Sequence, residues 1–220
     1  MELPGGPRAG LAAAYDPRWL HAHIPEIYDP VADSWEALPE ASLWQVAYPD
    51  MFLLPSGRLL YAGPNLRTYL LDLTAPAHWL TPGWSVSPFV GGTAVQYRPG
   101  LVLKTGSESS AGTTQGAIID LSGDEELAAW QTIAPMAQPR VKHNMTLLPD
   151  GDVLVTGGVQ VESNPATAVQ SPQIWHPTTG TWSAPLAAEG VVRDYHSSAI
   201  LLPDGRIFCG GGGRNLVDRA

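Results

Sequence analysis

Four stretches of this 220-residue chain repeat one hairpin pattern, in which two short apolar segments flank a turn that ends in glycine. They are DMFLLPSGRLLYAG (50–63), TAVQYRPGLVLKTG (93–106), NMTLLPDGDVLVTGG (144–158) and SAILLPDGRIFCGGG (198–212). Proline presets φ for a turn, aspartate hydrogen-bonds the backbone that follows, and glycine takes up the positive φ that the turn needs. Each stretch is therefore predicted to form a β-hairpin.

A second series of stretches alternates with the first, and each member is a strand, a polar turn and a segment ending in tryptophan. The members are PEIYDPVADSW (25–35), TYLLDLTAPAHW (68–79), GAIIDLSGDEELAAW (116–130) and PQIWHPTTGTW (172–182). Both series share a spacing of roughly 40 to 50 residues, which is typical of propeller repeats. Two hairpins give four strands, with glycine after the second and tryptophan in the fourth. The repeat predicts an all-β fold, a kelch-type β-propeller whose tryptophans pack between blades.

The order of the pieces predicts the domain organisation. We expect an irregular N-terminal segment at 1–23, propeller blades over 24–213 and a short tail at 214–220. The propeller region divides into a half blade (24–40), three whole blades (41–82, 85–136 and 137–189) and a second half blade (190–213). The two halves either pair and close a small four-bladed ring or leave an open arc cut from a larger ring, which the abrupt ends favour. Exposed blade edges would then allow self-association.

Composition excludes several classes of protein. The net charge of −9 is spread thinly and no run of Lys or Arg is present, so a nucleic-acid partner is not expected. No apolar run approaches the 18 or so residues that span a membrane, and the N-terminus lacks the apolar core of a signal peptide. Cys209 is the single cysteine, which rules out an internal disulfide, and we expect it to be a small buried thiol.

One stretch carries a more specific signal, because RDYHSSAILLPDGRIFCGGGG (193–213) places Tyr195 and His196 at the start of a hairpin. It resembles the stretch that supplies a Tyr-His pair to copper in the galactose oxidase and glyoxal oxidase family of copper radical oxidases. Residues 48–64 and 139–158 resemble blades of the same family, and the resemblance covers about residues 24 to 213.

The resemblance implies a copper cofactor near the propeller axis. In that family a primary alcohol or aldehyde, often a carbohydrate, is oxidised and dioxygen is reduced to hydrogen peroxide. Tyr195 would be the axial ligand and catalytic base, and His196 an equatorial ligand. Cu(II) favours such nitrogen and oxygen ligands. Neighbouring side chains on a regular strand point to opposite faces, so the two share an ion only where the backbone is irregular.

The rest of the family's copper centre is expected outside this chain. The radical tyrosine with its cross-linked cysteine belongs to blades before residue 1, and the second histidine to a segment after residue 220. We therefore expect an inactive fragment of an oxidase that is extracellular or periplasmic. The alternatives are a non-catalytic kelch propeller that binds a protein or glycan through its loops, and a truncated product with no stable fold.

Other polar residues are weaker candidates. His143 in RVKHN matches His196 if one gap is allowed, so it is either a further copper ligand or a residue that bonds loop carbonyls. Tyr48 lies nine residues before Gly57 and is expected to be a packing or rim tyrosine. His21 and His23 form a pair that can bind metals adventitiously, whereas His78 and His176 fall in outer turns and receive no role.

Overall fold

The computed structural model describes residues 23–44, 48–64, 67–80, 92–107 and 110–212. Over these residues the regular structure is β-strand, apart from two short 3₁₀ turns, η2 (Pro39–Ala41) and η3 (Pro165–Thr167). Within the same residues, no helix is long and apolar enough to cross a membrane. The prediction of an all-β fold is confirmed.

Three four-stranded antiparallel sheets form the body of the protein, and in each the strands follow one another in chain order. The first contains β3 (Asp50–Leu53), β4 (Leu59–Gly63), β5 (Tyr69–Asp72) and β6 (His78–Leu80). The second contains β7 (Thr93–Arg98), β8 (Leu101–Thr105), β9 (Gly116–Asp120) and β10 (Gln131–Thr132). The third contains β11 (Asn144–Leu147), β12 (Val153–Thr156), β13 (Gln173–His176) and β14 (Thr181–Trp182).

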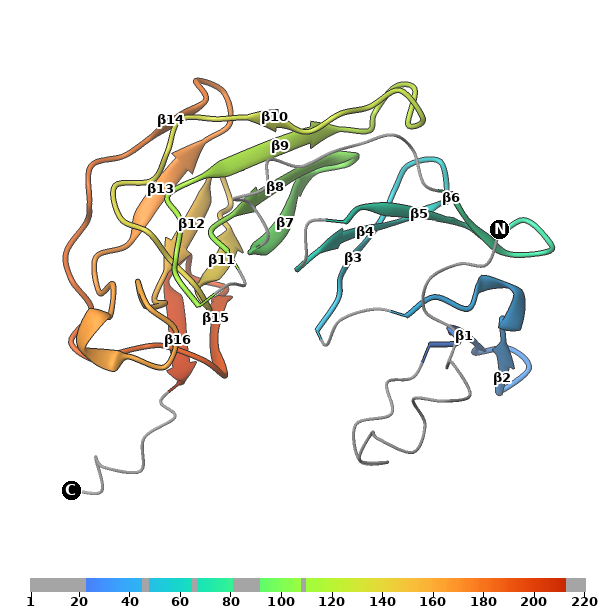
Figure 1. Ribbon diagram of the computed structural model, residues 1–220, viewed down its shortest axis with the longest axis horizontal. Coiled ribbons are helices and arrows are strands. Elements are labelled where there is room, and N and C mark those ends of the chain that lie inside the picture. The colour runs from blue at the N-terminus through green and yellow to red at the C-terminus, as the bar shows by residue number, and fades with distance from the viewer. Residues whose placement is uncertain (1–22, 45–47, 65–66, 81–91, 108–109, 213–220) are drawn as a thin grey trace.

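Two hairpins flank these sheets. One consists of β1 (Glu26–Asp29) and β2 (Ser34–Ala37), the other of β15 (Ser197–Leu201) and β16 (Ile207–Gly211). Each is a separate two-stranded sheet, so they do not pair into a composite blade. Figure 1 shows the five sheets as a curved row, with β1–β2 and β15–β16 at its two ends.

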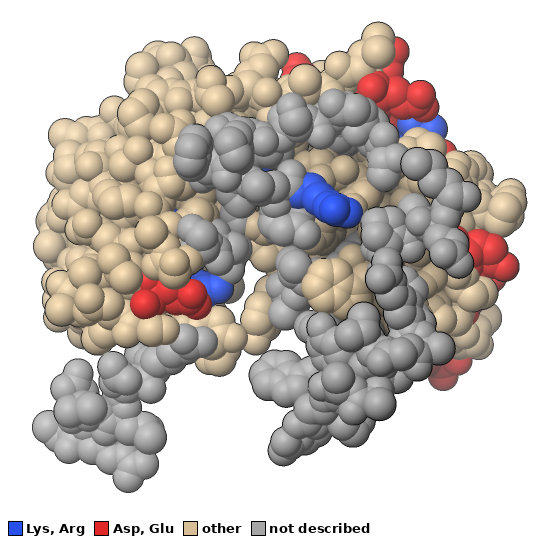
Figure 2. All heavy atoms as spheres, viewed as in Figure 1, with Lys and Arg blue, Asp and Glu red and all other residues tan. Residues whose placement is uncertain are grey.

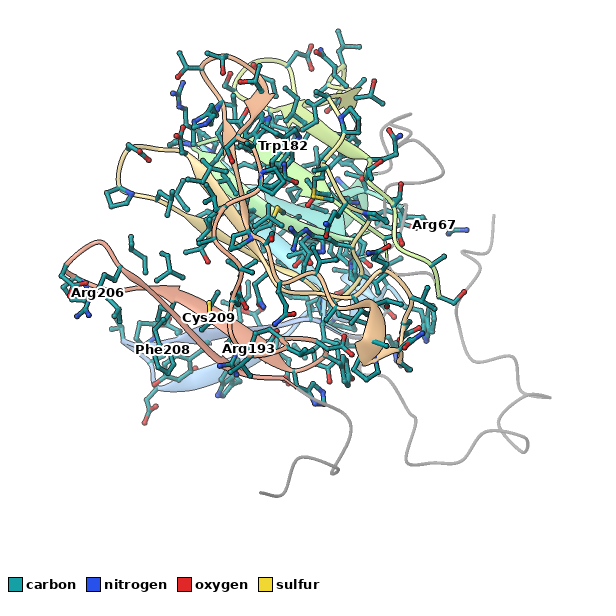
Figure 3. The ribbon with its side chains drawn as sticks, turned by 90° about the vertical axis from the view of Figure 1, so that its left-hand side faces the viewer. Arg67, Trp182, Arg193, Arg206, Phe208 and Cys209 are labelled. Atoms are coloured by element: carbon teal, nitrogen blue, oxygen red, sulfur yellow. The ribbon has the colours of Figure 1, made fainter. Side chains whose placement is uncertain are left out.

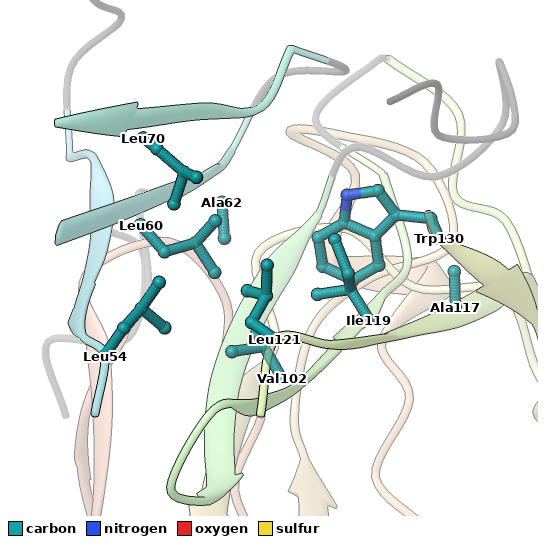
Figure 4. Close-up of a cluster of buried hydrophobic side chains, with 9 residues drawn as sticks. All are labelled: Leu54, Leu60, Ala62, Leu70, Val102, Ala117, Ile119, Leu121 and Trp130. Carbon is teal, nitrogen blue, oxygen red and sulfur yellow. The ribbon is translucent and has the colours of Figure 1, made fainter. Parts of the chain in front are cut away.

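The sheets are arranged as blades, because their first strands are neighbours: β3 contacts β7, β7 contacts β11, and β11 contacts β15. Adjacent sheets pack face to face through apolar side chains. Figure 4 shows the larger cluster, in which Leu54, Leu60, Ala62 and Leu70 of the first sheet meet Val102, Ala117, Ile119, Leu121 and Trp130 of the second. Burying such apolar surface is the main source of stability between the sheets. A propeller-type fold is therefore confirmed.

The turn chemistry follows the sequence pattern. In three hairpins the glycine amide donates to the carbonyl of the leucine three residues earlier, as in Gly151 to Leu148 at 3.0 Å. The turn glycines Gly57, Gly100, Gly151 and Gly205 all have φ between +77° and +90°. An L side chain rarely adopts that conformation, so these positions favour glycine. The local residues therefore determine where each hairpin bends.

Two of the four tryptophans of the series, Trp130 and Trp182, connect neighbouring sheets as predicted. Trp130 Nε1 donates to Thr68 Oγ1 at 3.0 Å, and Trp182 Nε1 donates to the Ala134 carbonyl at 2.8 Å. Trp79 Nε1 donates to the Ala41 carbonyl in η2 at 2.6 Å. Trp35 differs, since it is 67% exposed on β2. The β1–β2 hairpin has no neighbouring sheet over that face among the described residues, so the prediction is wrong for Trp35.

Candidate functional site

Tyr195 and His196 are the two central residues of a β-turn. The Ser197 amide donates to the Asp194 carbonyl at 3.0 Å, which closes the turn just before β15. His196 has φ +65°, the left-handed conformation that the third residue of a type II turn requires. Both rings consequently lie together, with centroids 3.7 Å apart and planes at 31°. The irregular backbone that a shared ion would need is therefore present.

The glycine run at the end of β16 allows this turn to pack closely. A Cβ atom added to Gly211 would lie 2.7 Å from the His196 carbonyl oxygen, closer than any real side chain comes. Gly211 also pairs with Ser197 across the hairpin. Glycine is thus needed at this position of β16, where the backbone that carries His196 comes close.

The turn opens into a cavity of about 460 Å³ at the point where the first strands of the sheets meet. Its walls come from three four-stranded sheets and from β15, together with the residues that precede their strands. The lining residues are Tyr48, Asp50, Pro64, Thr93, Lys142, His143, Asn144, Tyr195, His196, Ser197 and Ser198. A concave site with several polar groups from different blades is a typical small-molecule site.

A second tyrosine faces Tyr195 across this cavity. The Tyr48 hydroxyl lies 3.3 Å from the Tyr195 hydroxyl, and the two rings meet edge to face with centroids 6.4 Å apart. The Tyr48 and His196 rings are 6.5 Å apart. The hydrogen bond to Tyr195 raises the pKa of the Tyr48 phenol above its ordinary value. Two phenols and an imidazole, supplied by residues 147 positions apart, therefore converge in one place.

Tyr48, Lys142 and His196 occupy the same position in three repeats, nine residues before the turn glycine. All three have left-handed backbones, with φ of +60°, +57° and +65°, and all three line the cavity. In the remaining repeat this position is Gly91, which lies outside the described residues. Side chains other than glycine rarely adopt positive φ, and such strain clusters at functional sites. Sequence reasoning missed Lys142 because the one-gap alignment matched His143 to His196.

His143 lies one position further on and is directed into the protein. It is 4% exposed, and its Nε2 lies 2.9 Å from Thr105 Oγ1. The Thr105 hydroxyl also lies 3.3 Å from Met145 Sδ, and the buried Nδ1 of His143 has no hydrogen-bond partner among the described residues. Burial, with a smaller contribution from the Arg140 charge, lowers the pKa of His143 to about 3. A neutral, enclosed imidazole favours a structural role for His143.

The remaining sequence candidates lie away from the cavity. His78 and His176 are in strands, not in the turns expected: His78 begins β6 and His176 ends β13. His176 Nδ1 pairs with Asp152. Cys209 is half-buried in β16, and burial raises the pKa of its thiol. Figure 3 places Cys209 within the hairpin, with Arg206 at its turn. His23 does not line the cavity, and His21 lies outside the described residues.

Charged groups are sparse on one face of the described protein. Figure 2 shows a face on which Lys and Arg are scattered and acidic side chains form small separate groups. The described residues contain no cluster of three or more His, Cys, Asp or Glu side chains that could hold a metal by themselves. A metal at the cavity would therefore need the phenols of Tyr48 or Tyr195 beside the imidazole of His196.

Comparison with known proteins identifies the family. The family model described as glyoxal oxidase N-terminus matches residues 96–217, more than half of the chain. The chain belongs to the glyoxal oxidase family. Galactose oxidase of Gibberella zeae is 29% identical over 216 residues, covering 86% of this chain and 32% of its own length. Aldehyde oxidase GLOX of Vitis pseudoreticulata is 28% identical over 195 residues, covering 74% of this chain and 36% of its own.

A solved structure agrees with this assignment. A fungal alcohol oxidase of the AA5 family, in complex with copper, superposes with a TM-score of 0.75 at 25% sequence identity. The match covers 86% of this chain and 43% of that protein. The chain of this glyoxal oxidase family member spans about a third of the length of the curated relatives it matches.

The side chains of the cavity include the types of donor atom that copper binds. Cu(II) prefers nitrogen and oxygen donors in a tetragonal arrangement, and the turn presents one imidazole and one phenol side by side. The Tyr48 hydroxyl adds a second oxygen within 3.3 Å of the first. Two donor atoms on one ion are commonly separated by about this distance, since metal–ligand bonds are close to 2 Å. Tyr48, Tyr195 and His196 are three possible ligands, so the described residues do not provide a set of four.

Proposed function

We propose that this chain is part of an alcohol or aldehyde oxidase, in which Tyr195 and His196 bind copper. The observation that carries the proposal is the β-turn that directs both rings into one cavity, with His196 in the left-handed conformation. Membership of the glyoxal oxidase family supports it. When bound, copper supplies the single-electron chemistry that couples alcohol oxidation to dioxygen reduction.

The protein's own residues would bind and deprotonate the substrate. Tyr195 Oη would accept the hydroxyl proton of a primary alcohol or of a hydrated aldehyde. A phenol close to a metal ion ionises more readily than its ordinary pKa of about 10 allows. The Tyr48 hydroxyl, 3.3 Å away, would hold Tyr195 Oη in place by a hydrogen bond. His196 would act as a ligand, and its left-handed backbone fixes the direction of its ring.

We further propose that the chain by itself is inactive and that the complete enzyme acts outside the cytoplasm. The first proposal rests on the ligand count, since the cavity offers two phenols and one exposed imidazole rather than a complete set. It predicts that the purified chain releases no hydrogen peroxide from primary alcohols, even with copper added. Sustained peroxide production dependent on Tyr195 would contradict it.

Copper titration followed by electron paramagnetic resonance tests the binding site. With His21 and His23 replaced by alanine to remove adventitious metal binding, the chain is expected to take up one Cu(II) with hyperfine coupling to a single imidazole nitrogen. His196→Gln should remove that coupling, and Tyr195→Phe should weaken copper binding by about tenfold or more. His176→Gln is the matched control, because His176 is also partly exposed but lies on β13 beside Asp152. A spectrum unchanged by His196→Gln would contradict the assignment and favour a non-catalytic propeller.

A further inference from the structure

The hairpins β1–β2 and β15–β16 are each half of a four-stranded sheet. In every whole sheet the second strand pairs with the third, as β4 does with β5, β8 with β9 and β12 with β13. The β15–β16 hairpin matches the first two strands of a sheet, whereas β1–β2 matches the last two, since PEIYDPVADSW (25–35) repeats PQIWHPTTGTW (172–182). Among the described residues, neither β16 nor β1 has a strand along the edge that this pairing uses. An unpaired edge of this kind is a template for another strand.

The whole sheets predict the register in which the two half sheets would pair. In the first and third sheets, the residue two positions after the turn glycine pairs with the residue opposite the tryptophan, as Val153 pairs with Trp175. In β1–β2 the residue opposite Trp35 is Tyr28. The same register would pair Ile207 with Tyr28, Phe208 with Ile27 and Cys209 with Glu26.

Apolar side chains of both hairpins are exposed at positions where the whole sheets bury them. Trp175 and Leu60 are buried, whereas Tyr28 and Phe208 at the corresponding positions are 43% and 59% exposed. Ile200 pairs with Phe208 across the hairpin and is also largely exposed. Strands that covered these side chains would remove apolar surface from water, which favours association.

Charged residues support the same register. Arg58 follows the turn glycine of the first sheet, and its Nε donates to Asp72 Oδ2 at the end of β5, at 2.9 Å. The third sheet has a carboxylate and an imidazole in hydrogen-bond contact at the same two positions. In the half sheets these positions hold Arg206 and Asp29, which have opposite charges. Arg206 contacts Asp204 in an exposed pair, which contributes little by itself and can exchange for Asp29.

Within one chain the two half sheets lie at opposite ends of the row, and they do not pair (Figure 1). Each already has the place of a blade beside its own body, because β15 contacts β11 of the third sheet and η2, which follows β2, contacts β6 of the first. One chain provides three whole sheets and two halves, or four blade equivalents. Two copies would provide twice that number, at the upper end of the roughly four to eight blades typical of propellers.

We propose that two copies of this chain form a closed ring in which β16 of each copy pairs with β1 of the other. Each of the two contacts would complete a four-stranded sheet with two strands from each copy. The contacts join unlike surfaces head to tail, and a two-fold rotation closes them into a dimer. Pairing would cover Tyr28 and Phe208 and place Arg206 of one copy beside Asp29 of the other. The inference does not depend on the proposed oxidase function, because copper and the cavity take no part in it.

Sedimentation equilibrium of the 220-residue chain tests the dimer. The wild-type chain is expected to sediment at twice the mass of one copy, with a melting temperature that rises with chain concentration. Arg206→Glu and Asp29→Arg should each weaken the dimer by about tenfold or more, because like charges then face each other at both contacts. Arg98→Glu is the matched control, since Arg98 is exposed on β7 in the second sheet.

Mixing the two weakened variants distinguishes a second copy from a contact within one chain. A ring of one Arg206→Glu copy and one Asp29→Arg copy has opposite charges at both contacts. The equimolar mixture should therefore regain the wild-type affinity to within about threefold, while circular dichroism confirms that each variant is folded. A contact within one chain gives no such rescue, because each variant keeps its own pair of like charges.

A disulfide tests the register, since Cys209 is the single cysteine. Opposite residues of antiparallel strands have Cα atoms about 4.5 to 5.5 Å apart, which suits a disulfide. In the presence of oxidised glutathione, Glu26→Cys should cross-link to Cys209 of the second copy and give a covalent dimer on a non-reducing gel. Glu36→Cys is the control, because Glu36 lies on β2, one strand further from β16 in the proposed sheet.

A monomer at every concentration, as expected if further strands of a longer chain take these edges, would overturn the proposal. So would open assemblies of increasing size, or a mixture of variants that associates as weakly as each variant alone. A disulfide that forms within one chain, or equal cross-linking of Glu26→Cys and Glu36→Cys, would also contradict it.

Discussion

Two leading segments, residues 140–144 before β11 and 193–197 before β15, have similar sequences and fold into different structures. Both begin with arginine and contain a histidine three residues later. In the first, Arg140 and His143 are buried. In the second, Arg193 and His196 are partly or largely exposed, and the histidine is at the cavity. The difference shows that one repeated motif can serve either as a structural support or as the rim of a site.

The two arginines explain how each leading segment is held. Arg140 donates to the carbonyls of Gly157 and Ser171, both at 2.6 Å, and to Val169 at 3.4 Å. Burial lowers the pKa of Arg140 to about 10, which still leaves it charged at neutral pH. Arg193 donates to the Gly211 carbonyl at 2.6 Å from an exposed position, and Figure 3 shows it beside the β15–β16 hairpin. The buried arginine therefore fixes several loops, whereas the exposed one fixes the end of one hairpin.

The largest expected effect comes from removing these arginines in turn. Arg140→Met should lower the free energy of unfolding by about 3 kcal/mol or more, because buried carbonyls lose their donors. Arg193→Met should lower it by about 1 kcal/mol or less, since water can replace its hydrogen bond. Urea unfolding followed by circular dichroism measures both. Equal losses would show that the leading segments do not differ in the way their contacts indicate.

An effect of similar size is expected from two glycines that have the same φ. Gly158 and Gly205 both have φ +84°, but a Cβ atom at Gly158 would lie 2.6 Å from the Val141 carbonyl and 2.9 Å from His143 Cβ. No atom lies within 4 Å of the corresponding point at Gly205. Gly205→Ala should be destabilising by about 1 kcal/mol, and Gly158→Ala by about 3 kcal/mol. Thermal unfolding of both variants isolates the crowding around His143.

The pH dependence of stability should be carried in part by His143. Its pKa is lowered to about 3 in the folded protein, against 6.5 for an ordinary histidine. Between pH 6.5 and 3 the unfolded chain binds a proton that the folded chain does not, so stability falls as pH falls. The contribution of His143 to the slope of unfolding free energy against pH is at most about 1.4 kcal/mol per pH unit. Above the ordinary histidine pKa, His143 does not change the stability.

His143→Gln should therefore flatten the decline in unfolding free energy between about pH 6.5 and about pH 5. His196→Gln is the matched control, because it removes an exposed imidazole from the equivalent leading segment. If both variants keep the wild-type slope, then His143 is not the buried neutral base that its surroundings indicate.

The smallest effect concerns the contact between the leading segments. Asn144 Nδ2 donates to Ser197 Oγ at 2.8 Å, which joins β11 to β15 beside the cavity. A double-mutant cycle with Asn144→Ala and Ser197→Ala should give a coupling energy of about 0.5 to 1 kcal/mol. A coupling near zero would indicate that each leading segment is held by its own sheet alone.

Much of the fold was predictable because hairpins are local. Gly151 and its hydrogen bond to Leu148 lie within four residues, so turn chemistry alone predicts where the strands reverse. The alternation of two hairpin types then predicts four-stranded sheets. Trp35 does not pack between sheets as the other tryptophans of the series do. A tryptophan can pack in this way only if a neighbouring sheet covers it, and the local sequence around β1–β2 does not say whether one does.

The candidate site was predictable only in part. Tyr195 and His196 stood out as a motif, and their need for an irregular backbone followed from strand geometry. The convergence of Tyr48 with Tyr195 over 147 residues did not follow, nor did the burial of His143 in the cavity wall next to a partly exposed Lys142. One residue of register decides whether a side chain is accessible in the cavity or buried in its wall, and sequence alignment with a gap cannot determine it.

By itself the sequence determined the repeated hairpins, their turns and the Tyr-His pair, because these depend on residues within a few positions of one another. The tertiary structure alone decided which leading segments meet, which histidine is buried and where the accessible lysine lies. Those outcomes depend on how apolar faces such as Leu60 against Val102 and Tyr97 against Trp175 orient whole sheets. Packing between distant segments leaves no signal in the local sequence. The arrangement of the site residues is therefore determined only when the sheets pack together.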